Sequence, residues 1–208
     1  MPTTDFSEGA KEIARRDPVM AGLVKRFGPP AVRPPNRRGA FYALVQAIAY
    51  QQLAGRAAAA IHGRFLALFD GRLTAEAVLA MPEKQLLGAG LSRAKAASIR
   101  DLATKSLDGT VPLRGLSRLP DDEVVRRLSQ VRGIGRWTAE MFLIFQLRRP
   151  DVWPIDDLGV RRGFSVAYRL PALPSPAELL AEGERFRPYR SVAAWYCWQM
   201  ARTGLPTG

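Results

Sequence analysis

The chain has 208 residues, with 31 Lys and Arg against 19 Asp and Glu, so its formal net charge is +12 and its sequence pI is about 10.8. This length is enough for one domain with a sizeable core or for two small lobes. The excess cations, mostly arginine, indicate an anionic partner, and nucleic acid is favoured over a membrane because no strongly basic amphipathic terminus is present. The alternative is an ordinary basic surface that keeps the protein in solution.

The sequence contains one cysteine, Cys197, and one histidine, His62. A single cysteine excludes a disulfide within the chain and a four-thiolate iron–sulfur cluster. There is no cluster of Cys, His and carboxylate residues, which argues against a catalytic metal. Residues 1–19 have no apolar core of signal-peptide length, and no run is long enough to cross a membrane. We therefore expect a soluble, cytoplasmic protein.

The N-terminal third of the chain predicts helices joined by a rigid connector. Residues 1–38 hold a short amphipathic stretch and then the Pro/Arg-rich segment GPPAVRPPNRRG, which cannot form a continuous helix. Apolar residues at helical spacing follow at residues 40–53 and 56–69. The two predicted helices meet in a turn near Gln51.

The sequence also predicts helices in the middle of the chain. Short helices at residues 74–81 and 83–87 are separated by a proline, and a longer one begins after Ser92, a good N-cap residue. Asp121 is expected to cap the helix DDEVVRRLSQV. The next segment, RWTAEMFLIFQL at residues 136–147, is apolar nearly all round and is expected to be buried.

The last third predicts further helices, with the sequences VRRGFSVAYRL, AELLAEGERF and a final one capped by Ser191. No stretch alternates apolar and polar residues long enough to indicate a β-sheet. We therefore expect an all-α protein.

The stretch at residues 129–164, SQVRGIGRWTAEMFLIFQLRRPDVWPIDDLGVRRGF, carries the strongest functional signal. Gly133 and Gly135 lie between two helical segments, where a tight hairpin can turn backbone N–H groups towards a phosphate. About twenty residues later, Asp156 and Asp157 follow a proline-containing loop. This places a carboxylate near a surface suited to nucleic acid.

Three motifs in order, VRGIGRWTA, DVWPIDDLGVRRG and RPYRSVAAWYCW, resemble the helix-hairpin-helix DNA glycosylase superfamily, most closely its bacterial 3-methyladenine DNA glycosylase II (AlkA-like) branch. The resemblance covers roughly residues 40–200. It implies a two-lobed, all-α fold with the active-site cleft between the lobes. Residues 36–149 would form a helical barrel domain that contains the hairpin, and residues 1–35 and 150–208 a second lobe.

The resemblance also implies a hydrolytic excision of damaged bases. Asp157 aligns with the catalytic carboxylate, which stabilises an oxocarbenium-like sugar and orients or deprotonates the attacking water. Asp156 is the rival, although we expect it to cap or support the following helix; simple N-capping is the structural alternative for the pair. Trp137 stands where strand-cleaving relatives carry a lysine nucleophile, so we expect a monofunctional enzyme that leaves an abasic site. No iron–sulfur cluster and no other cofactor is expected.

An alkylated purine carries positive charge, so electron-rich aromatic faces can select it. Trp137 and Trp198 match aromatic positions of the family's pocket, with Tyr189, Trp153 and Met141 as further candidates. Core packing is the alternative for each of them, and for Trp195 we prefer it.

The DNA-binding residues implied by the resemblance lie in two turns. Leu53 matches the apolar wedge that fills the gap left by a flipped base, Gln52 could approach the opposite strand, and Ala54 departs from the usual Ser or Thr. The hairpin residues expected to contact phosphates are Arg132, Gly133, Gly135, Arg136 and Thr138. Arg132 replaces a common proline, which is expected to loosen the turn. The carbonyls of Ser129, Val131 and Ile134 would hold a monovalent cation.

The leading hypothesis is therefore a monofunctional DNA glycosylase that acts on alkylated purines such as 3-methyladenine and 7-methylguanine in double-stranded DNA. It would work as a monomer and associate with the nucleoid. The same fold acting on deaminated or etheno-modified bases is one alternative. A non-catalytic DNA-binding module is the other, and it would require neither Asp157 nor the aromatic set.

Overall fold

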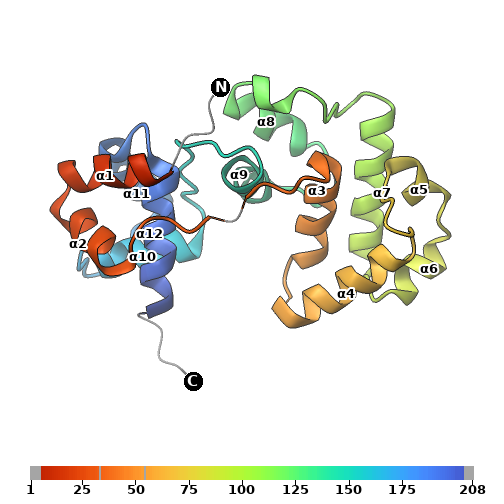
Figure 1. Cartoon of the computed structure of the whole chain (residues 1–208), viewed down its shortest axis with the longest axis horizontal. Helices are drawn as coiled ribbons and strands as arrows, with labels where there is room; N and C mark the ends of the chain where they lie inside the picture. The colour runs from red at the N-terminus through yellow and green to blue at the C-terminus, as the bar shows by residue number, and fades with distance from the viewer. Residues whose placement is uncertain (1–5, 33, 54, 204–208) are drawn as a thin grey trace. The chain divides into compact units, whose positions relative to one another are not determined.

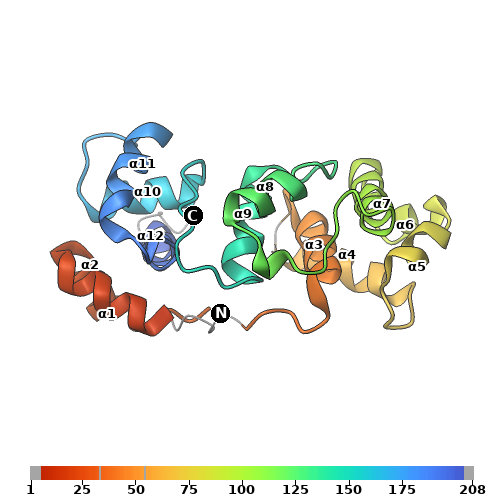
Figure 2. The same ribbon diagram turned by 90° about the horizontal axis from the view of Figure 1, so that it is seen from above.

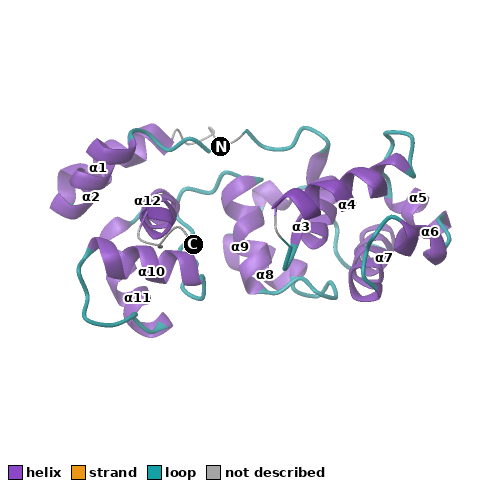
Figure 3. Cartoon of the chain, turned by 90° about the horizontal axis from the view of Figure 1, so that it is seen from below, coloured by secondary structure: helices purple, strands orange, loops and turns teal. Residues whose placement is uncertain are grey.

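The computed structural model describes residues 6–32, 34–53 and 55–203. Within these ranges the regular elements are helices joined by loops, with no β-strand, as Figures 1 and 3 show. The all-α prediction is confirmed. No helix in these ranges is both long enough and apolar enough to span a bilayer.

The chain divides into two compact units. Residues 35–142 form one, which we call the hairpin unit, and residues 1–34 with 143–208 form the other, which we call the terminal unit. The boundary at Phe142 falls inside a single helix, α9 (Arg136–Phe145). The barrel form expected for residues 36–149 stays a prediction.

The hairpin unit is built from α3 (Gly39–Tyr50), α4 (Gly55–Ala67), α5 (Ala75–Ala80), α6 (Glu83–Gly88), α7 (Arg93–Leu107), the 3₁₀ turn η1 (Leu116–Arg118), α8 (Asp121–Leu128) and most of α9. α7 packs against α3, α5 and α6, and α3 also packs against α4 (Figure 2). The fully buried side chains at the centre include Leu44, Ile48, Phe65, Ile99 and Leu102. α7 is therefore the helix around which most of this unit packs.

Two expected helix caps in the hairpin unit have different outcomes. Ser92 does cap α7, because its Oγ accepts a hydrogen bond from Lys95 N at 3.2 Å. The expectation for Asp121 is wrong: the N-cap of α8 is Pro120, and Asp121 is the first helical residue. Its carboxylate still lies in the first turn, where the helix dipole favours negative charge.

The terminal unit contains α1 (Phe6–Arg16), α2 (Pro18–Phe27), α10 (Leu158–Ala167), α11 (Pro176–Gly183), the 3₁₀ turn η2 (Glu184–Phe186) and α12 (Arg190–Thr203). α1 buries Phe6, Ala10 and Ile13 on one face, as its amphipathic sequence predicts. α2 was not expected, although Asp17 and Pro18 are its start signal. The Asp17 side chain accepts from Met20 N at 2.9 Å, and the proline occupies the first turn.

α10 and α12 form the tightest packing in the terminal unit (Figure 1). A Cβ atom on Gly163 of α10 would lie 1.8 Å from the carbonyl oxygen of Cys197 in α12. Only glycine therefore allows the two helix backbones to come this close. Ser191, expected to cap α12, instead lies inside its first turn, and its Oγ bonds to the loop that follows α9.

Candidate functional site

The hairpin between α8 and α9 depends on Gly133. This residue has φ +76°, a left-handed conformation that side chains with a Cβ rarely adopt. A Cβ here would also lie 2.5 Å from the Ser98 hydroxyl oxygen of α7. The glycine is thus required twice, by the turn and by the close approach to α7.

Side chains of α7 hold the hairpin backbone. Asp101 Oδ2 accepts from Arg132 N at 2.7 Å, and Lys105 Nζ donates to Gln130 O at 2.6 Å and to Asp101 Oδ2 at 2.8 Å. Burial works to raise the pKa of Asp101, but the hydrogen bonds from Lys105 and Arg132 outweigh it and the net shift is downwards. The expectation that Arg132 loosens the turn is therefore wrong. A proline at this position would lack the N–H that Asp101 binds.

The hairpin leaves polar groups directed away from its own structure. Among the described residues, the N–H groups of Gly133 and Gly135 donate no hydrogen bond to a backbone carbonyl. The side chains of Arg132 and Arg136 are exposed, and Arg136 also pairs with the buried Glu140 at 2.9 Å. The hairpin therefore offers backbone donors and two cations to an anion such as a phosphate.

Thr138 has a different place from the one expected. It is buried, and its Oγ1 accepts a hydrogen bond at 3.3 Å from Gln51 Nε2, which also donates to Gly133 O at 2.9 Å. The Thr138 side chain thus faces the protein and helps to hold the turn after α3. Gln51 is a contact that sequence reasoning missed, although its two neighbours in the motif QQL were named.

The turn after α3 carries Leu53, and its role as a wedge stays a prediction. Gln52 has φ +56° and is exposed, and Leu53 is 38% exposed. Just before the turn, Lys95 Nζ of α7 donates to Ala49 O at 2.9 Å. The same helix thus supports both the wedge turn and the hairpin. Ala54 lies outside the described residues.

The expected cation site at the carbonyls of Ser129, Val131 and Ile134 stays a prediction. Val131 O accepts a hydrogen bond from Ile134 N at 3.0 Å, as a tight turn requires. In the part of the chain that the structure describes, no group of three or more His, Cys, Asp and Glu could hold a metal ion.

Asp157 lies at the N-terminus of α10, in the terminal unit. Its Oδ1 accepts from Val160 N at 2.8 Å and from the indole Nε1 of Trp198 at 2.9 Å, and the residue is only 8% exposed. Asp157 is the N-cap, and the expectation that Asp156 would cap this helix is wrong because Asp156 points to solvent. These two hydrogen bonds fix the carboxylate of Asp157 in one orientation at the start of α10.

Gly159 allows Trp198 of α12 to come close to Asp157 at the start of α10. A Cβ on Gly159 would lie 2.9 Å from Cδ1 of Trp198 and 3.0 Å from Oδ1 of Asp157. Together with Gly163, it lets α12 approach α10 closely enough for an indole on one helix to reach the cap of the other.

An aromatic side chain that the sequence reasoning did not name completes this group. Phe145, 40% exposed, stacks on Trp198 with ring centroids 5.6 Å apart. It follows Trp137 and Met141 along α9 at intervals of four residues, so the three lie on one helix face. Trp137 is 45% exposed, and the expectation that α9 is buried all round is wrong for this face. The interval of four was the signal that could have identified Phe145.

The other aromatic candidates lie elsewhere in the terminal unit. Trp153 is buried in the core, where its indole donates to Leu179 O at 2.7 Å. Tyr189 packs against Gly9 of α1. Trp195, for which we preferred core packing, is half-buried and lies edge-on to Tyr196. The structure therefore brings together Asp157, Trp198 and Phe145, but not these three.

Comparisons with known proteins show the family of the chain. Residues 45–188 match the family model described as HhH-GPD superfamily base excision DNA repair protein. DNA-3-methyladenine glycosylase 1 of Schizosaccharomyces pombe is 39% identical over 162 residues, which cover 76% of this chain and 71% of that protein.

Solved structures are similar along nearly the whole chain. The S. pombe 3-methyladenine DNA glycosylase in complex with abasic DNA superposes with a TM-score of 0.80 at 36% identity, covering 92% of this chain and 95% of that one. A Bacillus halodurans DNA-3-methyladenine glycosidase gives a TM-score of 0.83 at 32% identity, with 94% and 89% covered. The chain belongs to the HhH-GPD superfamily of base excision DNA repair proteins.

Proposed function

We propose that this protein is a monofunctional DNA glycosylase that flips an alkylated purine out of double-stranded DNA and hydrolyses its N-glycosidic bond. The product is an abasic site, the first intermediate of base excision repair. The observation that carries the proposal is the carboxylate of Asp157, held at a helix N-terminus by Val160 N–H and the Trp198 indole beside an exposed aromatic ring. The 3-methyladenine glycosylases to which the chain is similar support this substrate class.

The reaction needs little from the protein beyond placement and charge. The bond between C1′ and N9 breaks, and its electrons leave with the purine, which neutralises the positive charge that alkylation created. Asp157 stabilises the positive charge that develops on the sugar. A water molecule then adds to C1′ and gives up a proton to the same carboxylate.

Selection of alkylated purines follows from the aromatic side chains. A cationic base is attracted to an indole face by about 0.5–2 kcal/mol depending on desolvation, whereas a neutral base lacks this term. The indole of Trp198 bonds to Asp157 and stacks on Phe145, and Trp137 and Met141 precede Phe145 on the same face of α9. We assign these side chains to the recognition of the flipped base.

DNA binding is assigned to the two turns that α7 supports. The N–H groups of Gly133 and Gly135 would bind phosphates together with Arg132 and Arg136, and a monovalent cation at the hairpin carbonyls would add to this site. Leu53 would fill the gap that the flipped base leaves. One flipped base needs one chain, so we propose a monomer that acts on chromosomal DNA in the cytoplasm.

Water is the proposed nucleophile because the hairpin carries Trp137 where an amine would be needed for strand cleavage. The test is to incubate the protein with duplex DNA treated with a methylating agent and to analyse the released bases and the strand. We expect free 3-methyladenine and 7-methylguanine, with strands that break only after alkali. A covalent adduct trapped by borohydride would contradict the hydrolytic mechanism.

A panel of duplexes, each with one defined lesion, tests the substrate class. We expect excision of the methylated purines to be faster than excision of hypoxanthine or ethenoadenine. The reverse order would favour the deaminated or etheno-base alternative, and binding without release of any base would favour a DNA-binding protein without activity.

A further inference from the structure

We propose that Arg190 and Asp151 are positioning residues for base excision, because their ion pair fixes the loop that presents Asp157. This inference rests on the proposed function. It assigns a role to two residues outside the group of Asp157, Trp198 and Phe145. Here "carboxylate loop" means residues 149–157, between α9 and α10.

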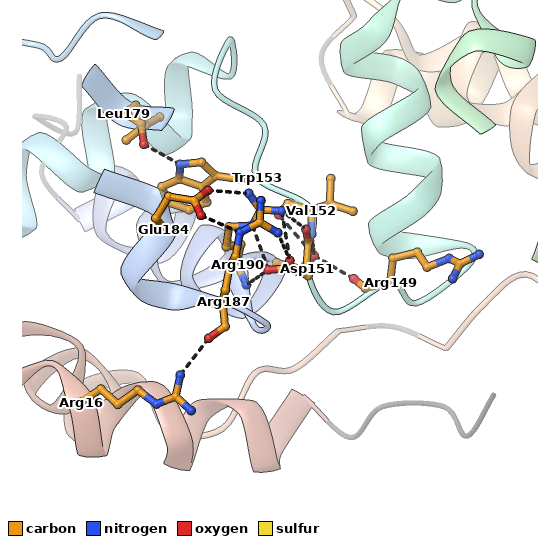
Figure 4. Close-up of polar contacts among 10 residues, drawn as sticks. Arg16, Arg149, Asp151, Val152, Trp153, Leu179, Glu184, Arg187 and Arg190 are labelled. Atoms are coloured by element: carbon orange, nitrogen blue, oxygen red, sulfur yellow. Dashed lines mark hydrogen bonds and ion pairs between the residues drawn. The ribbon is translucent and has the colours of Figure 1, made fainter. Parts of the chain in front are cut away.

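Arg190 and Asp151 form a bidentate ion pair, which we call the clamp (Figure 4). Arg190 Nε donates to Asp151 Oδ1 at 2.8 Å, and Arg190 Nη2 donates to Asp151 Oδ2 at 3.0 Å and to Asp151 O at 2.9 Å. The guanidinium thus holds both the side chain and the backbone of Asp151. Its side chain is only 12% exposed, so water competes weakly for these donors.

Further contacts fix the residues next to Asp151. Ser191 Oγ donates to Arg149 O at 2.7 Å and accepts from Val152 N at 2.9 Å, while Ser191 N donates to Pro150 O at 2.9 Å. Figure 4 shows the indole of Trp153 bonded to Leu179 O, beyond the clamp. Every residue from 149 to 153 therefore has a contact that holds its backbone or side chain to α11 or to the first turn of α12.

α12 connects this clamp to the reacting carboxylate. Arg190 begins the helix and Trp198 lies eight residues later on it, about 12 Å along the axis at 1.5 Å per residue. Arg190 holds the start of the carboxylate loop, and the indole of Trp198 bonds to Asp157 at its end. One rigid helix therefore sets the positions of both ends of the loop. A shift at Asp151 would move Asp157 relative to the helix that carries Trp198.

The pair has a property that a purely stabilising contact lacks. The Arg190 guanidinium makes three hydrogen bonds to one residue of a loop that has no regular structure of its own, and Arg187 Nη1 also donates to Asp151 Oδ2 at 2.8 Å. The geometry of these bonds determines where the loop lies. Lysine could keep the charge at position 190 but not the planar fork. Loss of the fork should therefore affect the rate of excision more than the binding of DNA.

The experiment measures single-turnover release of 3-methyladenine from a defined duplex at saturating protein, for the wild-type chain and for Asp151→Asn and Arg190→Lys. We expect the rate constant to fall about 100-fold, the loss that a displacement of about 1 Å can cause. Affinity for a duplex with an abasic site should stay the same. The matched control is Glu123→Gln in α8, which also removes one carboxylate charge from ion pairs with two arginines at a similarly half-buried side chain outside the carboxylate loop.

A role in stability alone predicts a different result. The variants would then have a lower free energy of unfolding in urea, but at urea concentrations below the unfolding transition their rate constants would equal that of Glu123→Gln. This result would overturn the proposal. The double variant Asp151→Asn with Arg190→Lys gives a second readout. Asp151→Asn weakens the ion pairs of Asp151 with both Arg190 and Arg187, so the double variant should be no slower than Asp151→Asn alone. Additive losses would also count against the pair.

The activity of the wild-type protein distinguishes a failure of the proposed function from a failure of the positioning role. If it releases no alkylated base, the proposed function fails. If it releases the base and both single variants do so at the rate of Glu123→Gln, only the positioning role fails. If Asp151→Asn does not fold, Arg190→Lys, which keeps the charge, decides the outcome.

Discussion

The hairpin and the carboxylate loop are held in place by different means. The hairpin offers backbone N–H groups, and its shape comes from the left-handed φ of Gly133 and from the absence of a Cβ against Ser98. The carboxylate loop offers one side chain, Asp157. Its shape comes from polar side chains of α12, where Arg190 and Trp198 hold partners 39 and 41 residues away in the sequence.

The difference indicates what each region tolerates. Where the backbone itself is the binding group, any added Cβ that changes its conformation should do damage, whereas side chains around it can vary. Where one carboxylate must be held in a fixed orientation, the loss of a single hydrogen-bond donor to it should lower activity even when the backbone conformation is unchanged. The following predictions test this contrast, from the largest expected effect to the smallest.

The largest effect is expected at the contact between α10 and α12. Gly163→Ala would place a Cβ 1.8 Å from Cys197 O, so the helices must separate. Such overpacking should lower the free energy of unfolding by about 3 kcal/mol in urea titrations. The control is Gly22→Ala in α2, where nothing lies within 4 Å and the gain in helix propensity should stabilise the protein slightly. Equal stability of the two variants would contradict the close packing.

In the hairpin, Gly133→Ala should lower the free energy of unfolding by about 1–2 kcal/mol from the left-handed φ alone. The contact with Ser98 adds to this, and affinity for undamaged duplex should fall as the N–H groups turn away. Gly135→Ala is the comparison for urea titrations, because a Cβ there meets no atom within 4 Å and φ is not positive. If both changes cost the same stability, the hairpin does not depend on the conformation of Gly133.

In the carboxylate loop, Trp198→Phe keeps an aromatic ring to stack on Phe145 but removes the indole N–H that donates to Asp157. We expect single-turnover excision to slow about tenfold, which corresponds to about 1.4 kcal/mol, with DNA affinity retained. Trp195→Phe removes an indole that lies edge-on to Tyr196 and should leave the rate unchanged. Loss of DNA affinity in Trp198→Phe, with the rate retained, would reverse the roles assigned here.

The smallest expected effect is a pH dependence of stability that differs between the two units. His62, the only histidine, lies buried in the hairpin unit between Tyr42 and Tyr50; burial, and then the charge of Arg38, lowers its pKa. The unfolded chain therefore binds a proton at higher pH than the folded one, and stability is lost as the pH falls below about 6.5, by at most about 1.4 kcal/mol per pH unit.

Hydrogen exchange can locate this loss. Between pH 7 and pH 5.5, the free energy of opening derived from exchange should decrease in α3 and α4 but not in α10 and α12, and His62→Phe should remove the difference. A decrease of the same size in α10 and α12 would show that another group is responsible.

Local patterns were enough to predict the all-α fold, the cap at Ser92 and the hairpin glycines, because each depends on residues that are neighbours in the sequence. Asp157 was chosen as the catalytic carboxylate through the family resemblance, and that role stays a prediction. The helix cap was assigned to Asp156, since two adjacent carboxylates before a helix look alike until one of them is seen to face the first turn.

What the sequence could not reveal depends on pairs far apart in the chain. Nothing in the segment RRPDVWP indicates that Asp151 meets Arg190, and nothing in QQL indicates that Gln51 binds the hairpin. Phe145 is different: its interval of four from Trp137 and Met141 was visible, but the apolar character of α9 suggested burial all round.

The measurement that tests the central claim most directly is single-turnover release of 3-methyladenine by Asp157→Asn. Asparagine can still accept from Val160 N and Trp198 Nε1, so the helix cap and the loop should survive while the negative charge is lost. We predict a rate constant lower by roughly 100- to 1,000-fold, with unchanged affinity for abasic DNA and unchanged stability. Release at the wild-type rate by a folded Asp157→Asn protein would show that this carboxylate does not act on the sugar.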